Sequence, residues 1–220
     1  MWTLLKLGLV LALVAVIALG GILAWVVVRG YPQRDGTAQL SGLSAPVKVV
    51  RDQNGIVNIY ASTPDDLFAA QGWVHASERM WQMEVWRHIG AGRLAELFGQ
   101  SQVERDEFIR TLGWRQSAER DMAALSPSTR RLLDAYSSGV NAWLEAHPDL
   151  PLPFVVTGLL GVGGGLSGYK PEPWTALDTV TWQKVQAWSL GSNWESEIFR
   201  LIARGRGHAV LHEAHAHRSG

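Results

Sequence analysis

The sequence has 220 residues, in which 20 lysines and arginines balance 20 aspartates and glutamates, so no net positive charge argues for binding to nucleic acid. It contains no cysteine, which excludes disulfides and thiolate metal sites. Residues 31–220 are numerous enough to form one domain with a buried core.

The N-terminal segment is apolar. From Leu7 to Val28 no residue is charged, and Lys6 and Arg29 bracket the run. A helix of this length, at about 1.5 Å per residue, spans a hydrocarbon core of about 30 Å. The run also exceeds the apolar region of about 7–15 residues that signal peptides carry. The sequence therefore predicts a transmembrane signal anchor over residues 1–29, in preference to a cleaved signal peptide, and a polar linker over residues 30–45.

A β-hairpin is expected next. Residues Val47–Arg51 and Ile56–Tyr60 are rich in β-branched side chains, and the intervening Asp52–Gly55 ends in Asn-Gly. Asn-Gly tolerates the positive φ angles of tight turns, so the pattern indicates two antiparallel strands joined by a short loop.

A long helix should follow the hairpin. Ser62 or Thr63 can cap it, and Pro64 suits its first turn. Apolar side chains then recur at helical spacing, in a stripe wide enough to predict burial on more than one side. Gly90 and Gly92 are expected to end this helix.

Three more helices are predicted downstream. One begins at Ser126 and carries Gly139 in its interior, where the propensity penalty of about 1 kcal/mol suggests close packing. A second follows a capping box formed by Thr175 and Asp178. The third runs from Asn193 to about Ala203.

Two short motifs, one for dinucleotide binding and one for metal binding, lack part of the pattern that each function requires. Gly163-x-Gly165-x-x-Gly168 matches a dinucleotide fingerprint, but no helix start follows it, so residues 158–168 are interpreted as a glycine-rich loop. The C-terminal residues 204–220 are rich in histidine yet contain no HExxH pattern, and they are predicted to be a disordered tail. No spacing singles out a catalytic carboxylate pair. Most carboxylates are expected to be solvated or ion-paired; Glu84 and His88, for example, are neighbours at i and i+4 on a helix.

Several segments together resemble the penicillin acylase family. They are, in order, VKVVRDQNGIVNIYA (47–61), GWVHASERMWQMEVWR (72–87), GRLAELFG (92–99), LLDAYSSGVNAW (132–143) and KPEPWTALD (170–178). The resemblance covers about residues 46–203, and it is the order of the segments that makes it specific.

The resemblance implies an α+β fold: a mainly helical α-chain part of an αββα N-terminal-nucleophile hydrolase, with an edge β-hairpin. Such enzymes are made as one precursor, or zymogen, and the serine that begins the β-chain attacks the amide. Their substrates include β-lactam side-chain amides and acyl homoserine lactones. This sequence shows no serine-led β-chain. We therefore expect it to be an α-subunit portion, truncated and inactive alone, with no catalytic residue and no organic cofactor of its own.

The resemblance also assigns two sets of site residues. Glu197 matches an α-chain glutamate that ligates a structural calcium shared with the β-chain, and oxygen ligands suit this cation. Leu190, Asn193 and Trp194 match a segment that lines the acyl pocket. The expected partners are the β-chain of the same precursor, the membrane and a small acyl-amide substrate. The expected location is a single-pass anchor with an extracytoplasmic domain.

Two alternatives remain open at this point. The chain could be a non-catalytic, membrane-tethered fragment that only binds a partner, or a helical membrane-proximal scaffold unrelated to hydrolases.

Overall fold

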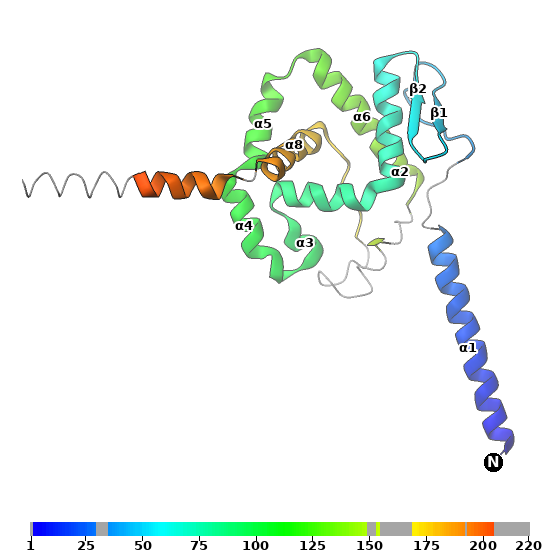
Figure 1. Ribbon diagram of the computed structural model, residues 1–220. Helices are drawn as coiled ribbons and strands as arrows, with labels where there is room; N and C mark the ends of the chain where they lie inside the picture. The colour runs from blue at the N-terminus through cyan, green and yellow to red at the C-terminus, as the bar shows by residue number, and fades with distance from the viewer. Residues whose placement is uncertain (1, 30–34, 149–152, 155–168, 192, 205–220) are drawn as a thin grey trace, which may run out of the picture. The chain divides into compact units, whose positions relative to one another are not determined.

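The computed structural model describes residues 2–29, 35–148, 153–154, 169–191 and 193–204 (Figure 1). Its elements in chain order are α1 (Trp2–Arg29), β1 (Lys48–Arg51), β2 (Val57–Tyr60), α2 (Pro64–Ala91), α3 (Leu94–Phe98), the 3-10 helix η1 (Gln100–Gln102), α4 (Val103–Leu112), α5 (Trp114–Ala124), α6 (Pro127–Ala146) and α8 (Ala176–Leu190). Residues 194–204 are also helical. The described part is thus mainly helical with one two-stranded sheet, as expected.

The N-terminal helix α1 requires a correction. Among the residues whose side chains the structure describes, no helix is both long enough and apolar enough to cross a bilayer. A helical crossing needs about 20 consecutive apolar residues. This finding contradicts the predicted transmembrane anchor and the single-pass membrane location, and it leaves the membrane as a partner without support.

The predicted hairpin is confirmed. Strands β1 and β2 pair antiparallel, from Lys48 opposite Tyr60 to Arg51 opposite Val57. The carboxylate of Asp52 closes the loop, because its Oδ1 accepts hydrogen bonds from the backbone N–H groups of Asn54 at 2.9 Å and Ile56 at 2.8 Å. Of the two Asn-Gly residues only the glycine has a positive φ, +79°, as in loops where one left-handed residue follows a type I turn.

Helix α2 begins as predicted. Thr63 is the N-cap, its Oγ1 accepts the backbone N–H of Asp66 at 3.1 Å, and Pro64 opens the first turn. The helix ends later than the first candidate glycine, because Gly90 is still helical and Gly92 takes the left-handed capping conformation. Arg79 has non-helical angles (φ −137°, ψ 16°), and α2 bends sharply there into two arms (Figure 1).

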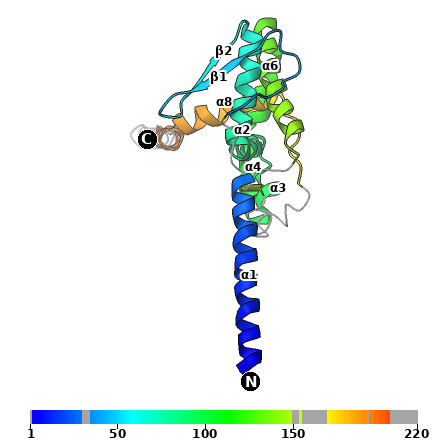
Figure 2. The same ribbon diagram turned by 90° about the vertical axis from the view of Figure 1, so that its right-hand side faces the viewer.

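Helices α2 and α6 cross at unusually close range. A Cβ added to Gly139 would lie 1.8 Å from the carbonyl oxygen of Ala69, and one added to Gly72 would lie 2.1 Å from that of Tyr136. Both glycines thus allow backbone to meet backbone, which confirms the predicted close packing at Gly139. Figure 2 shows the two helices side by side, beside the hairpin. The core around this crossing contains Ala76, Met80, Val140, Trp143, Phe154 and Trp174.

Helices α3 to α5 were not anticipated from the sequence. Helix α3 obtains its N-terminal cap from a distant side chain: the two carboxylate oxygens of Asp106 in α4 accept the backbone N–H groups of Leu94 at 2.8 Å and Ala95 at 2.7 Å. Gly113, with φ +72°, separates α4 from α5.

The described chain divides into two compact units, Met1–Trp182 and Gln183–Gly220. The predicted boundaries at residues 45 and 203 stay predictions. The glycine-rich loop 158–168 and the tail from residue 205 onward lie outside the described residues.

Candidate functional site

The predicted calcium ligand lies on the helix over 194–204. The Glu197 side chain is 58% exposed, and its Oε1 pairs with Nη1 of Arg200 one turn later at 2.9 Å. Calcium takes six to eight oxygen ligands, and the described residues contain no group of three acidic, histidine or cysteine side chains able to hold a metal. Within the described chain Glu197 therefore offers one ligand of suitable chemistry and does not form a site by itself.

The predicted acyl-pocket residues lie close to Glu197 in sequence and are exposed. Leu190, the last residue of α8, is 83% exposed. The backbone carbonyl of Asn193 accepts the N–H of Glu197 at 3.0 Å, so Asn193 begins the following helix. The Trp194 ring packs against that of Trp188, with centroids 5.2 Å apart. Their assignment to a substrate pocket stays a prediction.

The same unit exposes further large apolar side chains. Phe199 and Leu201 are each 72% exposed, and Ile198 and Ile202 are about half exposed. Clustered exposed apolar residues mark interaction surfaces in folded proteins. The predicted site residues thus share a helical segment with an apolar surface.

A buried charge cluster lies in the first unit, on the second arm of α2. The Nη2 of Arg87 donates to both carboxylate oxygens of Glu84, at 2.7 and 2.5 Å, and both side chains are almost fully buried. The hydroxyl of Tyr169 donates to the same carboxylate. Burial lowers the pKa of Arg87, but the attraction of Glu84 outweighs it and the net shift is upward. Burial, and then the bond to Glu84, raise the pKa of Tyr169.

This cluster cannot serve as a general base, because the donors of Arg87 and Tyr169 occupy the Glu84 carboxylate. Its evident role is to fasten residues 169–174 to α2. Nη1 of Arg87 donates to the carbonyl of Glu172 at 2.9 Å, and the guanidinium lies 5.5 Å from the ring centroid of Trp174. Asn141 of α6 completes the attachment, since it both accepts from Trp174 N at 2.6 Å and donates to Trp174 O at 2.9 Å.

A second, more exposed network borders the cluster. Arg93 binds Glu172 at 2.8 Å and Glu96 at 2.7 Å. The hydrogen bond from Arg93 lowers the pKa of Glu172 to about 2, and it also lowers the pKa of Glu96. These groups are charged at neutral pH and lie on the surface. They are therefore suited to holding the segment in place rather than to proton transfer.

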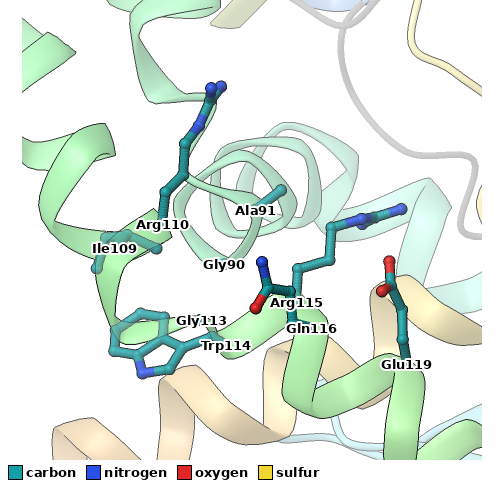
Figure 3. A pocket seen from close by; sticks show the side chains of 9 residues that line it. All are labelled: Gly90, Ala91, Ile109, Arg110, Gly113, Trp114, Arg115, Gln116 and Glu119. Atoms are coloured by element: carbon teal, nitrogen blue, oxygen red, sulfur yellow. The ribbon is translucent and has the colours of Figure 1, made fainter.

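A small pocket lies where α2 ends and α4 passes into α5 (Figure 3). Its volume is about 240 Å³, below the range of about 300–1,000 Å³ typical of small-molecule sites. The Arg110 guanidinium points away from Gln116 and Glu119, and its Nε donates to the carbonyl of Gly92 at 2.8 Å. Nη1 of Arg115 pairs with Asp178 at 3.3 Å. The arginines are thus engaged in structural contacts, and the pocket shares no residue with the predicted site.

Sequence reasoning missed the buried cluster. Glu84 and His88, noted as helix neighbours, do lie close together, with Oε1 of Glu84 3.5 Å from Nδ1 of His88. The shorter ion pair of Glu84 is with Arg87 at i+3, at 2.5 Å, while the histidine Nδ1 donates to the backbone carbonyl of Glu84 at 2.8 Å. The available signal was the long apolar stripe around Glu84 and Arg87, which required any charge on that face to be paired.

Comparison with known proteins gives consistent matches. A family model described as penicillin amidase matches residues 46–216. Penicillin acylase 2 proenzyme of Pseudomonas sp. strain SE83 is 37% identical over 172 residues, which is 78% of this chain and 21% of that protein. The acyl-homoserine lactone acylase QuiP of Pseudomonas fluorescens strain Pf0-1 is 33% identical over 197 residues, which is 90% of this chain and 23% of that protein.

A solved structure also matches. The thermostable penicillin G acylase from Alcaligenes faecalis superimposes with a TM-score of 0.57 and 28% sequence identity, covering 67% of this chain and 75% of that chain. The chain spans only about a fifth of the length of the curated relatives it matches.

Proposed function

The chain belongs to the penicillin amidase family, and from this premise we propose that it is the α-subunit portion of an enzyme that hydrolyses the carbon–nitrogen bond of linear amides. The observation that carries the proposal is the extent of the match: the family model covers residues 46–216, which include the hairpin, α2, α6 and α8.

The proposal includes a missing partner. In a complete enzyme the described helices and hairpin would form the α-chain part of an αββα sandwich, and a β-chain from the same precursor would supply the remaining sheets and the nucleophilic serine. The name proenzyme of the Pseudomonas relative is consistent with a precursor. The exposed apolar side chains of residues 190–202 support such a partner. Burying them would stabilise the assembly by a free energy of about 25 cal/mol per Å² of apolar surface.

The substrate class follows from the relatives. One is named a penicillin acylase and another an acyl-homoserine lactone acylase. Both names describe enzymes that act on an acyl group, so we propose an N-acyl amide substrate of one of these two types. Within this chain Leu190, Asn193 and Trp194 would line the acyl pocket, and no residue of the chain would perform the bond-breaking step.

Calcium is proposed as a structural ion shared with the β-chain. Glu197 would contribute one carboxylate after release from Arg200, and β-chain oxygens would complete the shell. The described residues supply a single ligand, so the isolated chain should bind calcium no better than an exposed carboxylate does.

The proposal is tested by co-producing the full chain with the region of the Pseudomonas penicillin acylase 2 proenzyme that follows its matched segment. We expect the two to co-purify and to hydrolyse aryl-acetyl or long-chain acyl amides, and each alone to be inactive. A partner whose leading serine is replaced by alanine is the matched control: it should bind the chain without turnover. Turnover by the chain alone, or no association with the partner, would overturn the proposal.

A further inference from the structure

The hairpin loop contains a peptide bond with unusual reactivity. The sequence has four asparagines, at positions 54, 58, 141 and 193, and only Asn54 precedes a glycine. Asn54 and Gly55 are both exposed, and a Cβ added to Gly55 would meet nothing within 4 Å. No side chain therefore shields the backbone nitrogen that follows the Asn54 amide.

We propose that Asn54–Gly55 is a site of spontaneous deamidation, and that its rate is set by opening of the hairpin loop. The deprotonated backbone nitrogen of Gly55 attacks Cγ of Asn54 and forms a new N–Cγ bond. The Cγ–Nδ2 bond breaks and ammonia leaves, which gives a five-membered cyclic imide. Water then opens the imide at either carbonyl and yields aspartate or isoaspartate at position 54. The only co-reactant is water, and no oxidation takes place.

The closed loop restrains this reaction. The attacking nitrogen is already engaged, because the Gly55 N–H donates to the Asp52 carbonyl at 3.0 Å. The Asp52 carboxylate also holds the N–H groups of Asn54 and Ile56 on either side of it. Attack requires these bonds to open, so the rate is proportional to the fraction of molecules in which the loop is open.

An ion pair next to the loop links the hairpin to α2. Arg51, the last residue of β1, pairs with Glu78 of α2, and both side chains remain partly exposed. The sheet has only two strands, and such a hairpin has little stability by itself. We therefore infer that the Arg51–Glu78 contact helps to keep the loop closed and slows the modification.

Modification would prevent the loop from closing again. An isoaspartate inserts a methylene group into the backbone between positions 54 and 55 and adds a carboxylate near Asp52. The Asp52 carboxylate could then no longer accept both N–H groups, and the Arg51–Val57 pair would be lost from the register. The inference does not depend on the proposed function, because it rests on this loop alone.

The test follows the full chain in mildly alkaline buffer by peptide mapping with mass spectrometry. We expect replacement of the side-chain NH₂ by OH at Asn54 first, as aspartate and isoaspartate, with the other three asparagines unchanged over the same time. Asn141 is a stringent internal control, because Trp174 occupies both ends of its amide.

Two variants test whether the Arg51–Glu78 ion pair keeps the loop closed. Glu78→Gln should accelerate conversion at Asn54 by about 1.5- to 5-fold, the effect of losing an exposed ion pair on the open fraction. Glu119→Gln, another surface carboxylate, should leave the rate unchanged. If the folded chain shows no conversion while the urea-unfolded chain converts, the loop is not a modification site. Equal rates of conversion at Asn54 in the wild type and both variants would overturn the inference that the Arg51–Glu78 ion pair slows the modification.

Discussion

The crossing of α2 and α6 predicts a specific effect of one methyl group. In Gly139→Ala the new Cβ would lie 1.8 Å from the carbonyl oxygen and 2.7 Å from the carbonyl carbon of Ala69. Real Cβ atoms do not approach backbone so closely, so the two helices must separate by more than 1 Å at the crossing. The obstacle is backbone rather than a flexible side-chain tip, so it cannot be relieved by a change of rotamer.

The size of the effect follows from two opposing terms. Overpacking costs about 1–3 kcal/mol, and the rigid obstacle favours the upper end. The alanine recovers about 1 kcal/mol of helix propensity. The net destabilisation should therefore be about 2 kcal/mol, which corresponds to a fall in Tm of about 4–8 °C for a chain of this size.

Denaturant unfolding followed by tryptophan fluorescence measures this change, because Trp73 lies beside the crossing. The matched control is Ser138→Ala, on the exposed side of α6 one residue away, which should change the free energy of unfolding by no more than about 0.5 kcal/mol. If Gly139→Ala stabilises the chain as much as or more than Ser138→Ala does, the close approach of the two backbones is refuted.

Three further predictions concern the charge clusters and the exposed apolar segment. Arg87→Met should destabilise the chain by about 3–5 kcal/mol, because it leaves the Glu84 carboxylate buried without its charge partner. Adding Glu84→Gln should recover part of this loss in denaturant unfolding, and an additive double mutant would refute the pairing. Arg93→Met should raise the pKa of Glu172 from about 2 toward its ordinary value near 4.5, measured by NMR titration of the carboxyl carbon. A lowered pKa contributes stability above pH 4.5 that is lost as the pH falls toward 2. The variant should therefore lose less stability over that range than the wild type. An unchanged pKa of Glu172 would contradict the role of Arg93 in lowering it. Phe199→Ser should reduce the binding of a hydrophobic dye to the isolated chain, whereas replacement of an exposed polar residue in the same helix should not, because the ring is 72% exposed.

The hairpin and the ends of α2 could be predicted from sequence because their determinants are local. Asn-Gly between two β-rich runs, and Thr63 before Pro64, act on their immediate neighbours. Gly139 was informative for a related reason: a costly glycine inside a helix requires a packing explanation, and the approach of Ala69 provides one.

Helices α3 to α5 could not be predicted in the same way, because their stabilising contacts are distant in sequence. The cap of α3 comes from Asp106 in α4, and neither α4 nor α5 has a side-chain cap. The bend at Arg79 also lacks a proline or glycine signal. The nearest local cause is Ser77, whose Oγ donates to the carbonyl of Val74 at 2.8 Å, a contact that often bends helices.

The candidate site illustrates a different limit. Leu190, Asn193, Trp194 and Glu197 were predicted to be site residues through a family resemblance. The family membership itself is now established. The roles proposed for them would require oxygen ligands and pocket walls beyond those that the described residues provide. If the site is shared with a second chain, as proposed, spacing within this chain alone could not define it.

A chimeric enzyme tests the central claim most directly. The matched segment of the Pseudomonas penicillin acylase 2 proenzyme would be replaced by residues 46–203 of this chain, and a parallel chimera carrying the corresponding segment of the acyl-homoserine lactone acylase QuiP would show that grafts are tolerated. Hydrolysis of N-acyl amides is then measured on the purified proteins. If this chain is an α-subunit portion of an amide hydrolase, its chimera should mature and turn over substrate at a rate comparable to the control graft. A chimera that folds but neither matures nor hydrolyses amides, beside an active control graft, would contradict the account.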